Sequence, residues 1–448
     1  MSELSTEELE GIRLIRERMK GEIPSDLDTD FNVRRWWTAY NGQLDTLLPA
    51  FRAQIANRRL AGNKRFYRAG YDDPQQFMAD FQELPVVAEC MQFLNVCQAN
   101  EANPIDNSIV FFECAIGDQS KFVKVIRSSR YVGMFHASCE YFLQRILHQE
   151  AKTGRPSGGI CVYDMAGTRL LELFNPLSPI NPLLLSRAVL WQEHYAELLQ
   201  KVFIVNPPCG LSALWKVISW MINKKYHTKF QFVSKYEQLL GEYYTLVDQN
   251  TRQLVILGSD MRRLAASRKQ IATDPNNTVS PYCISEHLDA SVLPRVYGGR
   301  LESVGGYAGS LPNRVPRPIE PADYYQLGDT WRRHGFTGAL PKDKDLTTVH
   351  ISRTQTHAKD ILISTANATL LWQWRCPGSV EFSVTYQTAG NEETQEPLLP
   401  LYKLATSKLP EEDGLQCKRT GTYRVQFHNP SHYLPVTVHY ATVVLTQS

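Results

Sequence analysis

The sequence predicts a multidomain protein: a small helical module, an α/β domain with a mainly parallel sheet, and an all-β domain. Three observations lead to this fold class. Helical periodicity dominates the first 70 residues, strand-like apolar runs then alternate with helical patterns as far as Gly299, and after residue 320 apolar and polar residues alternate. The chain has 448 residues, of which 43% are hydrophobic and 21% charged, so it can fold into two or three globular domains.

The N-terminal module is expected to begin with a capped helix. Ser5 and Glu8 form an S-x-x-E capping box, and Leu4 and Leu9 can pack against each other across it. A second helix is expected over Leu44–Leu60, where apolar residues recur every three to four positions. We expect this module to occupy residues 1–75.

Four strand-like runs predict the sheet of the middle domain, residues 76–300. Helical patterns over Phe135–His148 and Leu183–Leu199 lie between these runs. Because strands and helices alternate, we expect a parallel sheet with crossover helices. The four runs are IVFFECAI, GGICVYDMAG, KVFIVNPP and RQLVILGS.

The stretch Lys201–Ile222 combines a buried type of strand with an unusually apolar helix. Pro207, Pro208 and Gly210 end the strand, and Ser212 is a suitable N-cap for the helix that follows. This helix is apolar nearly all round and too short to span a bilayer. Three roles stay open from the residues alone: a plain core helix, a cover over an apolar cavity, or a segment that enters a membrane surface.

The C-terminal part is predicted to be a β-sandwich, residues 323–446, after a linker rich in glycine and proline at residues 301–322. Its strand-like runs alternate apolar and polar residues and are separated by turn signals. They are TTVHISRT, DILISTANATLLWQWR, SVEFSVTY, GTYRVQFHN and LPVTVHYATVVL.

The composition excludes several classes of protein. With 48 basic and 46 acidic residues the chain lacks the basic excess of a nucleic-acid-binding protein. Nine cysteines without paired spacing indicate free thiols in a reducing compartment and no metal site. The N-terminal residues show no apolar signal segment, so we expect a cytoplasmic protein that visits internal membranes peripherally. A basic cluster that directly follows the apolar helix suits anionic lipid headgroups: Lys224, Lys225, His227 and Lys229.

Motifs for catalysis and phosphate binding are absent from the sequence: it contains no Walker loop, G-x-S-x-G or H-E-x-x-H. His136 and Cys139 could in principle pair as base and nucleophile, but a buried structural pair is favoured. Asp164 ends a strand, where a turn or capping role is favoured over catalysis. The sequence therefore predicts a non-enzymatic binding protein without cofactor or metal.

Motifs in a fixed order resemble those of two families. The segments VYDMAG, NPPCGLSALWKVI, ILGSD and LPRVYGG resemble, in that order, the motifs of the CRAL-TRIO lipid-transfer domain. The C-terminal runs LLWQW and SVEFSVTY, together with the last strand-like runs, resemble a GOLD β-sandwich. The combination is similar to the animal subgroup that includes supernatant protein factor and tocopherol-associated protein.

This resemblance implies that one hydrophobic lipid, for example a phospholipid or a tocopherol, is held in a pocket and exchanged at membranes. An apolar gating helix would close the pocket, and the GOLD domain would dock to membranes or to a Golgi or trafficking protein. The alternative is a lipid-sensing adaptor that acts through its GOLD domain. The gate residues are expected to be Leu211, Leu214, Trp215, Lys216, Val217, Ile218, Trp220, Met221 and Ile222, and the pocket-lining strand residues Val162, Tyr163, Phe203 and Val205.

Two departures from the family pattern limit what can be carried over. Relatives that bind inositol lipids combine a gate lysine with a hydroxyl and an acid, whereas here Lys216 is accompanied by Ala213 and no acid lies in Leu183–Leu190. The resemblance therefore does not imply inositol-lipid specificity. Residues 233–253 look inserted, either as a surface excursion or as the product of an unspliced intron.

Overall fold

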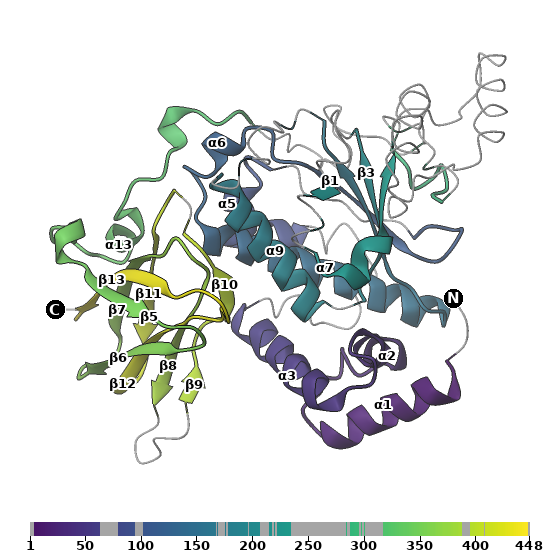
Figure 1. The fold of residues 1–448 in the computed structure, drawn as a ribbon, viewed down its shortest axis with the longest axis horizontal. Coiled ribbons are helices and arrows are strands. Elements are labelled where there is room, and N and C mark those ends of the chain that lie inside the picture. The colour runs from purple at the N-terminus through teal and green to yellow at the C-terminus, as the bar shows by residue number, and fades with distance from the viewer. Residues whose placement is uncertain are drawn as a thin grey trace.

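The structure is a computed structural model that places an α/β domain between a helical module and a C-terminal β-sandwich (Figure 1). In its described residues, no helix is long and apolar enough to cross a membrane. It describes residues 4–62, 79–94, 102–166, 178–195, 197–206, 222–233, 287–294, 317–387, 395–406 and 408–446, and the single positions 168, 175, 215, 216, 219, 284, 297 and 300.

Three helices form the N-terminal module: α1 (Thr6–Arg18), α2 (Asp30–Ala39) and α3 (Leu44–Leu60). The expected capping box is present, and α3 has the bounds that its periodicity predicts. Helix α2 was not predicted. It is held by its core side chains, since Trp36 stacks on Phe51 of α3 with ring centroids 4.5 Å apart.

The α/β domain contains the expected parallel sheet, in the order β1 (Ile109–Cys114), β2 (Gly159–Asp164), β3 (Leu199–Val205) and β4 (Phe230–Val233). Strands β1 and β2 fall within predicted runs, and β3 begins two residues before the run KVFIVNPP. The fourth strand matches no predicted run, because the four-residue segment FQFV is too short to stand out as a strand pattern. The predicted run RQLVILGS lies outside the described residues, as do residues 234–253 of the expected insertion.

Two long helices cover one face of this sheet: α7 (Ser128–Thr153) and α9 (Ile180–His194). Helix α7 extends the predicted Phe135–His148 at both ends. Helix α9 ends five residues before the predicted Leu199, because β3 begins there. Two shorter helices belong to the same domain: α5 (Pro85–Cys90) and α6 (Gln119–Phe122).

Buried charges join the N-terminal module to α7. Arg58 at the end of α3 is 2% exposed and donates hydrogen bonds to Glu140 at 2.7 Å and to Asp26 at 2.8 Å. A second buried pair joins Arg35 to Glu150. Breaking such pairs leaves an uncompensated buried charge, so the module is fixed to the α/β domain.

The C-terminal part is a β-sandwich of two antiparallel sheets around one core. Trp374 from one sheet meets Phe382 from the other with ring centroids 5.5 Å apart, and Phe382 contacts Phe427 at 5.2 Å. One sheet is ordered β11 (Glu411–Cys417), β7 (Ala368–Arg375), β13 (Val436–Leu445) and β5 (Thr347–Ile351); the other is ordered β10 (Tyr402–Leu404), β8 (Val380–Gln387), β12 (Gly421–His428) and β6 (Thr356–Ile363), with β9 (Gln395–Pro397) beside β8.

Sequence alternation located five of these strand regions. The run DILISTANATLLWQWR proves to contain the second half of β6 and all of β7, separated by a turn. Strands β9, β10 and β11 were not predicted: β9 and β10 have three residues each, and β11 carries the polar sequence EEDGLQC. Residues 301–316 of the expected linker lie outside the described residues.

The β-sandwich packs directly on α7 and α9. Val132 of α7 and Leu190 of α9 belong to the same apolar cluster as the sandwich core. Ser128 donates a hydrogen bond from Oγ to the carbonyl oxygen of Ala405 at 2.8 Å. The two helices therefore lie between the parallel sheet and the β-sandwich (Figure 1).

Candidate functional site: an apolar cavity with a buried ion pair

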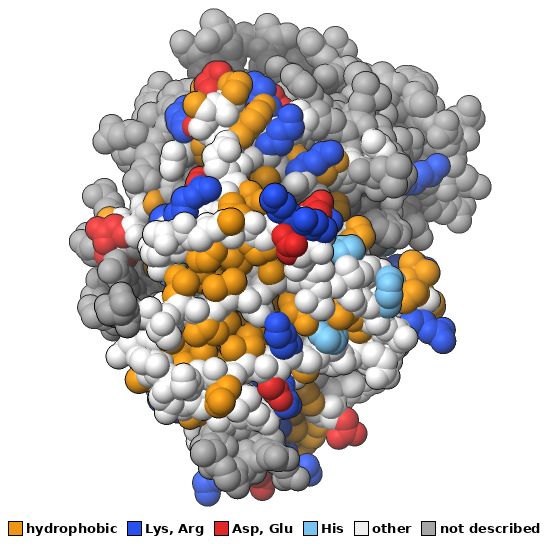
Figure 2. Space-filling view, turned by 90° about the vertical axis from the view of Figure 1, so that its left-hand side faces the viewer, with side chains coloured by type: hydrophobic (Ala, Val, Ile, Leu, Met, Phe, Trp, Pro, Cys, Tyr) orange, Lys and Arg blue, Asp and Glu red, His pale blue; other side chains and the backbone are white. Residues whose placement is uncertain are grey.

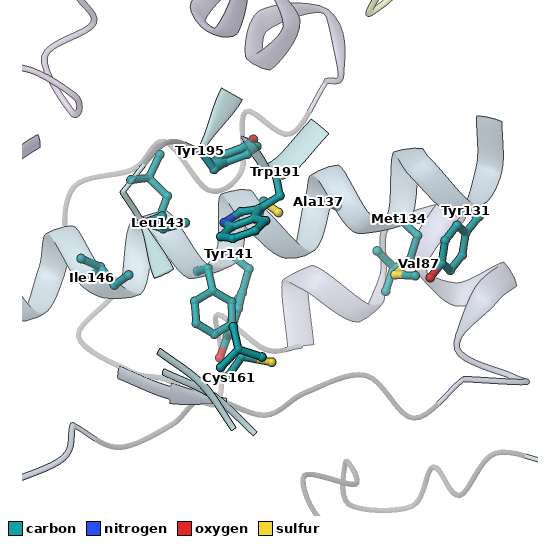
Figure 3. Close-up of a cluster of buried hydrophobic side chains, with 14 of the residues drawn as sticks. Val87, Tyr131, Met134, Ala137, Tyr141, Leu143, Ile146, Cys161, Trp191 and Tyr195 are labelled. Atoms are coloured by element: carbon teal, nitrogen blue, oxygen red, sulfur yellow. The ribbon is translucent and has the colours of Figure 1, made fainter. Parts of the chain in front are cut away.

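A cavity of about 210 Å³ lies between the parallel sheet and the two long helices. Most of its lining is aliphatic or aromatic, and Figure 3 shows part of the surrounding core, with Tyr131 and Met134 on α7, Trp191 on α9 and Cys161 on the sheet. The described lining residues are Leu94, Phe111, Glu113, Cys114, Ile116, Tyr131, Met134, Phe135, Ser138, Cys139, Phe142, Cys161, Tyr163, Leu184, Arg187, Ala188, Trp191, Leu198, Leu199, Val202, Ile204, Ile222 and Phe230.

Strand alternation decides which sheet residues reach this cavity. Successive side chains of a strand point to opposite faces, so Cys161 and Tyr163 line the cavity while Val162 between them does not. Of the four predicted strand positions only Tyr163 is in the lining. Val162, Phe203 and Val205 were chosen on the wrong face: they pack in a separate cluster with residues from the later part of the domain. Those partners are Ile284, Leu288, Val292, Leu293 and Tyr297.

Three of the nine expected gate residues are described. Ile222 contributes to the cavity lining. Trp215 is partly buried and packs beside the cavity edge, with its ring centroid 5.8 Å from Phe232. Lys216 is exposed. The remaining six lie outside the described residues: Leu211, Leu214, Val217, Ile218, Trp220 and Met221.

One ion pair interrupts the apolar lining. Arg187 of α9 forms a bidentate pair with the carboxylate of Glu113 at the end of β1, and it donates a further hydrogen bond to the hydroxyl of Tyr131 at 3.3 Å. Burial alone would lower the pKa of Arg187, but the charge of Glu113 raises it well above the usual value. The guanidinium therefore stays charged inside the domain.

The ring of Phe135 adds to the environment of this pair. Its centroid lies 4.3 Å from the guanidinium carbon of Arg187, which gives a cation–π contact. Sequence reasoning missed Glu113, Arg187 and the lining residues of α7. Glu113 breaks the apolar run IVFFECAI and Arg187 breaks LLLSRAVLW, so a charge inside a run of core type was the available signal.

Trp191 adds a further polar atom to the lining, and this atom has no hydrogen-bond partner. Its side chain lines the cavity and is 7% exposed, and its indole Nε1 is buried without a hydrogen-bond partner. Its ring packs against Tyr226, with centroids 5.3 Å apart. A buried donor of this kind is available to an oxygen of a bound molecule.

His136 and Cys139 do not form a base and nucleophile pair. The Nδ1 atom of His136 lies 2.7 Å from the hydroxyl of Tyr402 in the β-sandwich, whereas Cys139 lines the cavity. Burial lowers the pKa of His136 to about 3 and raises the pKa of the Cys139 thiol well above its usual value. A neutral thiol without a base is a poor nucleophile.

Asp164 stabilises a turn, as expected. Its carboxylate accepts hydrogen bonds from the backbone N–H of Ala166 at 2.9 Å, from Asn206 Nδ2 at 2.9 Å and from the hydroxyl of Tyr297 at 2.6 Å. It holds the carboxyl ends of β2 and β3 together. In the described part of the chain no cluster of histidine, cysteine, aspartate and glutamate side chains is suited to a metal ion.

The structure combines an α/β domain that contains an apolar cavity with a C-terminal β-sandwich. Residues 120–250 match the family model of the CRAL/TRIO domain, so the chain contains a CRAL-TRIO domain. Domains of this family bind lipids, which supports lipid binding or transfer as the general class of function.

Two similar proteins extend the comparison. A CRAL-TRIO domain-containing protein of Caenorhabditis elegans is 24% identical over 437 residues, which cover 96% of this chain and 94% of that protein. The crystal structure of Sfh5 aligns with 61% of this chain and 100% of its own, at 14% identity and a TM-score of 0.39.

Proposed function

We propose that this protein binds one hydrophobic lipid in the cavity between the sheet and helices α7 and α9, and exchanges it at membranes without chemical turnover. The observation that carries the proposal is the coincidence of an almost wholly apolar cavity with the CRAL-TRIO match. The reaction chemistry that the sequence left open is unsupported, because Cys139 has no base and Asp164 is engaged in a turn.

The energetics favour a binding protein with a closed cavity. Each methylene group that leaves water contributes about 0.8 kcal/mol, so a lipid leaves a bilayer only for an equally apolar interior. Rings and aliphatic side chains from both helices and from alternate strand positions supply that interior. Release then requires a segment that uncovers the cavity.

The segment Leu211–Ile222 is the proposed gate. Its sequence is apolar nearly all round, and Ile222 at its end is part of the cavity lining.

The basic cluster that follows offers fewer side chains to a membrane than the sequence indicated, because two of its lysines bind other parts of the protein. Lys225 donates a hydrogen bond to the carbonyl oxygen of Ala39 at 2.7 Å, and Lys229 pairs with Glu197 at 2.6 Å. Lys224 is exposed and stays available to an anionic lipid surface.

The β-sandwich is proposed to be a GOLD domain that docks the protein to internal membranes or to a trafficking partner. The turn between β12 and β13 presents Tyr433, 84% exposed, and Leu434, 69% exposed. Ser431 Oγ accepts hydrogen bonds from both backbone N–H groups, which holds this turn in shape. Figure 2 shows hydrophobic side chains gathered in the middle of the face that the sandwich forms. A lipid-sensing adaptor that works through this domain is the second candidate.

A cytoplasmic location is part of the same proposal. The cysteines described as free are Cys90, Cys114, Cys139, Cys161, Cys376 and Cys417, and free thiols in this number suit a reducing compartment.

Native mass spectrometry of the purified full-length protein tests the proposed function. We expect a population heavier than the polypeptide by the mass of one lipid, and extraction of that lipid should remove the added mass. Purified protein that carries no lipid, and takes up none from mixed phosphatidylcholine and neutral-lipid vesicles, would contradict the proposal. A soluble lipid extract of the same preparation identifies the bound species.

A further inference from the structure

We infer that the Glu113–Arg187 pair is the polar anchor of the cavity and selects a lipid whose buried end is an uncharged hydroxyl group. This inference rests on the proposed lipid-binding function. Glu113 and Arg187 are the two charged residues among the described cavity-lining residues, and every other polar group there belongs to a serine, cysteine, tyrosine or tryptophan. The polar end of a bound lipid is therefore expected to contact the Glu113–Arg187 pair.

The hydrogen-bonding capacity of the pair fits a group that both donates and accepts. Arg187 has five N–H donors, and its contacts with Glu113 and Tyr131 occupy three of them. Each carboxylate oxygen of Glu113 accepts one hydrogen bond from Arg187 and retains a second lone pair. A hydroxyl group can donate to Glu113 and accept from Arg187 at the same time, whereas an ether or ester oxygen can only accept.

Charge balance excludes an ionised end. The pair is already neutral as a whole, because Arg187 keeps its proton beside Glu113. A carboxylate or phosphate would add an uncompensated negative charge beside Glu113 in an apolar interior, and an amine would add a positive charge beside Arg187. An alcohol adds no charge and completes the hydrogen bonds.

The rest of the lining agrees with a single small polar end. Arg187 is packed under the ring of Phe135, so it has little room for a bulky headgroup on that side. The unpartnered indole N–H of Trp191 offers one further donor to a ligand oxygen. The predicted ligand class is therefore a long-chain or polycyclic alcohol.

Competitive loading of the full-length protein tests this inference. Dioleoylphosphatidylcholine vesicles carry equal amounts of octadecan-1-ol, its methyl ether and stearate, and the lipids recovered with the protein are quantified by mass spectrometry. We expect the alcohol to be enriched about tenfold over the ether, the ratio that one hydrogen bond to a charged group produces, and over stearate by at least as much.

Two double variants distinguish the loss of the polar anchor from a general loss of protein stability. Glu113→Leu with Arg187→Met removes both charges together, so no unpaired charge is left, and we expect the enrichment to fall to about onefold while total lipid uptake persists. The matched control is Glu89→Leu with Arg130→Met, an ion pair of the same domain outside this cavity, which should keep the enrichment.

The outcomes distinguish the two proposals. Recovery of lipid without preference for the alcohol in the wild type, or with the same preference in the anchor variant, overturns the inference and leaves the proposed function standing. Preferred loading of stearate overturns it as well. Recovery of none of the lipids overturns the proposed function itself.

Discussion

The imidazole Nδ1 of His136 and the hydroxyl of Tyr402 lie 2.7 Å apart, and this contact joins helix α7, which lines the apolar cavity, to the β-sandwich. Helix α7 thus presents one side to the cavity, through Met134 and Cys139, and another to the sandwich. A movement of the sandwich that shifts α7 would therefore also move Met134 and Cys139 in the cavity lining.

The first prediction concerns the pH dependence that the burial of His136 creates. Burial lowers the pKa of His136 to about 3, and the unfolded chain has a histidine pKa near 6.5. The unfolded state therefore binds more protons below that value. The stabilising effect of the neutral imidazole is complete above about pH 6.5 and is lost as the pH falls, at up to about 1.4 kcal/mol per pH unit.

Urea unfolding at pH 7.0 and pH 5.0 of the wild type and of His136→Gln measures this dependence. The wild type should lose more unfolding free energy than the variant over that interval. Burial also lowers the pKa of His194, which is why only the difference between the two proteins is informative. Equal losses would show that His136 titrates normally in the folded state.

The second prediction concerns the buried charges beneath the N-terminal module. Glu140 accepts hydrogen bonds from Arg58 and from the hydroxyl of Tyr195, and its side chain is 0% exposed. Glu140→Ala should lower the unfolding free energy by about 3 kcal/mol, because the buried guanidinium of Arg58 loses its carboxylate partner on α7. The exposed Glu17, paired with Arg13, is the control, and Glu17→Ala should cost less than about 1 kcal/mol. Similar costs in urea unfolding would contradict this account.

These elements also show how far sequence reasoning reaches. The capping box of α1 and the bounds of α3 follow from local patterns, and the alternation of strands and helices predicts that β1, β2 and β3 are parallel. Helix α2 and strands β4, β9 and β10 are short and are held by tertiary contacts, which leave no periodic signal.

The candidate site was only partly predictable for a related reason. A continuous apolar strand is buried on both faces, so its sequence does not say which face meets the cavity, and Val162 and Phe203 were chosen in place of Cys161 and Val202. The partner of Arg187 lies 74 residues earlier in the chain, at Glu113, and only the fold brings them together. The family motifs therefore located the domain, but not the ion pair inside the cavity.

The third prediction tests the proposed gate. Trp215→Asp combined with Trp220→Asp places two charges on the segment that must enter lipid, so vesicle-to-vesicle transfer of a fluorescent lipid should be abolished while the fold survives. Near-ultraviolet circular dichroism verifies the fold, since Trp215 also packs on Phe232. Ile105, 55% exposed and outside the gate, supplies the control variant Ile105→Asp. Unchanged transfer in the double variant would rule out the gate assignment.

The fourth prediction addresses docking by the β-sandwich. Tyr433→Ala with Leu434→Ala removes the two most exposed large apolar side chains of the β12–β13 turn, so binding to phosphatidylcholine and phosphatidylserine vesicles should weaken, as measured by co-sedimentation. Leu362, 75% exposed on strand β6, gives the matched control Leu362→Ala. Loss of vesicle binding in the control alone would show that this turn is not the docking surface.

Filling the cavity tests the central claim most directly. Ala188 of α9 lines the cavity, so a tryptophan at this position would displace part of a bound lipid. Loss of the contacts of two methylene groups costs about 1.6 kcal/mol, which lowers the affinity about tenfold. The measurement is the rate of lipid transfer between vesicles by Ala188→Trp, with Lys152→Trp at the exposed end of α7 as the matched control. The account predicts that transfer falls at least tenfold in the first variant and stays unchanged in the second. Undiminished transfer by Ala188→Trp would contradict it.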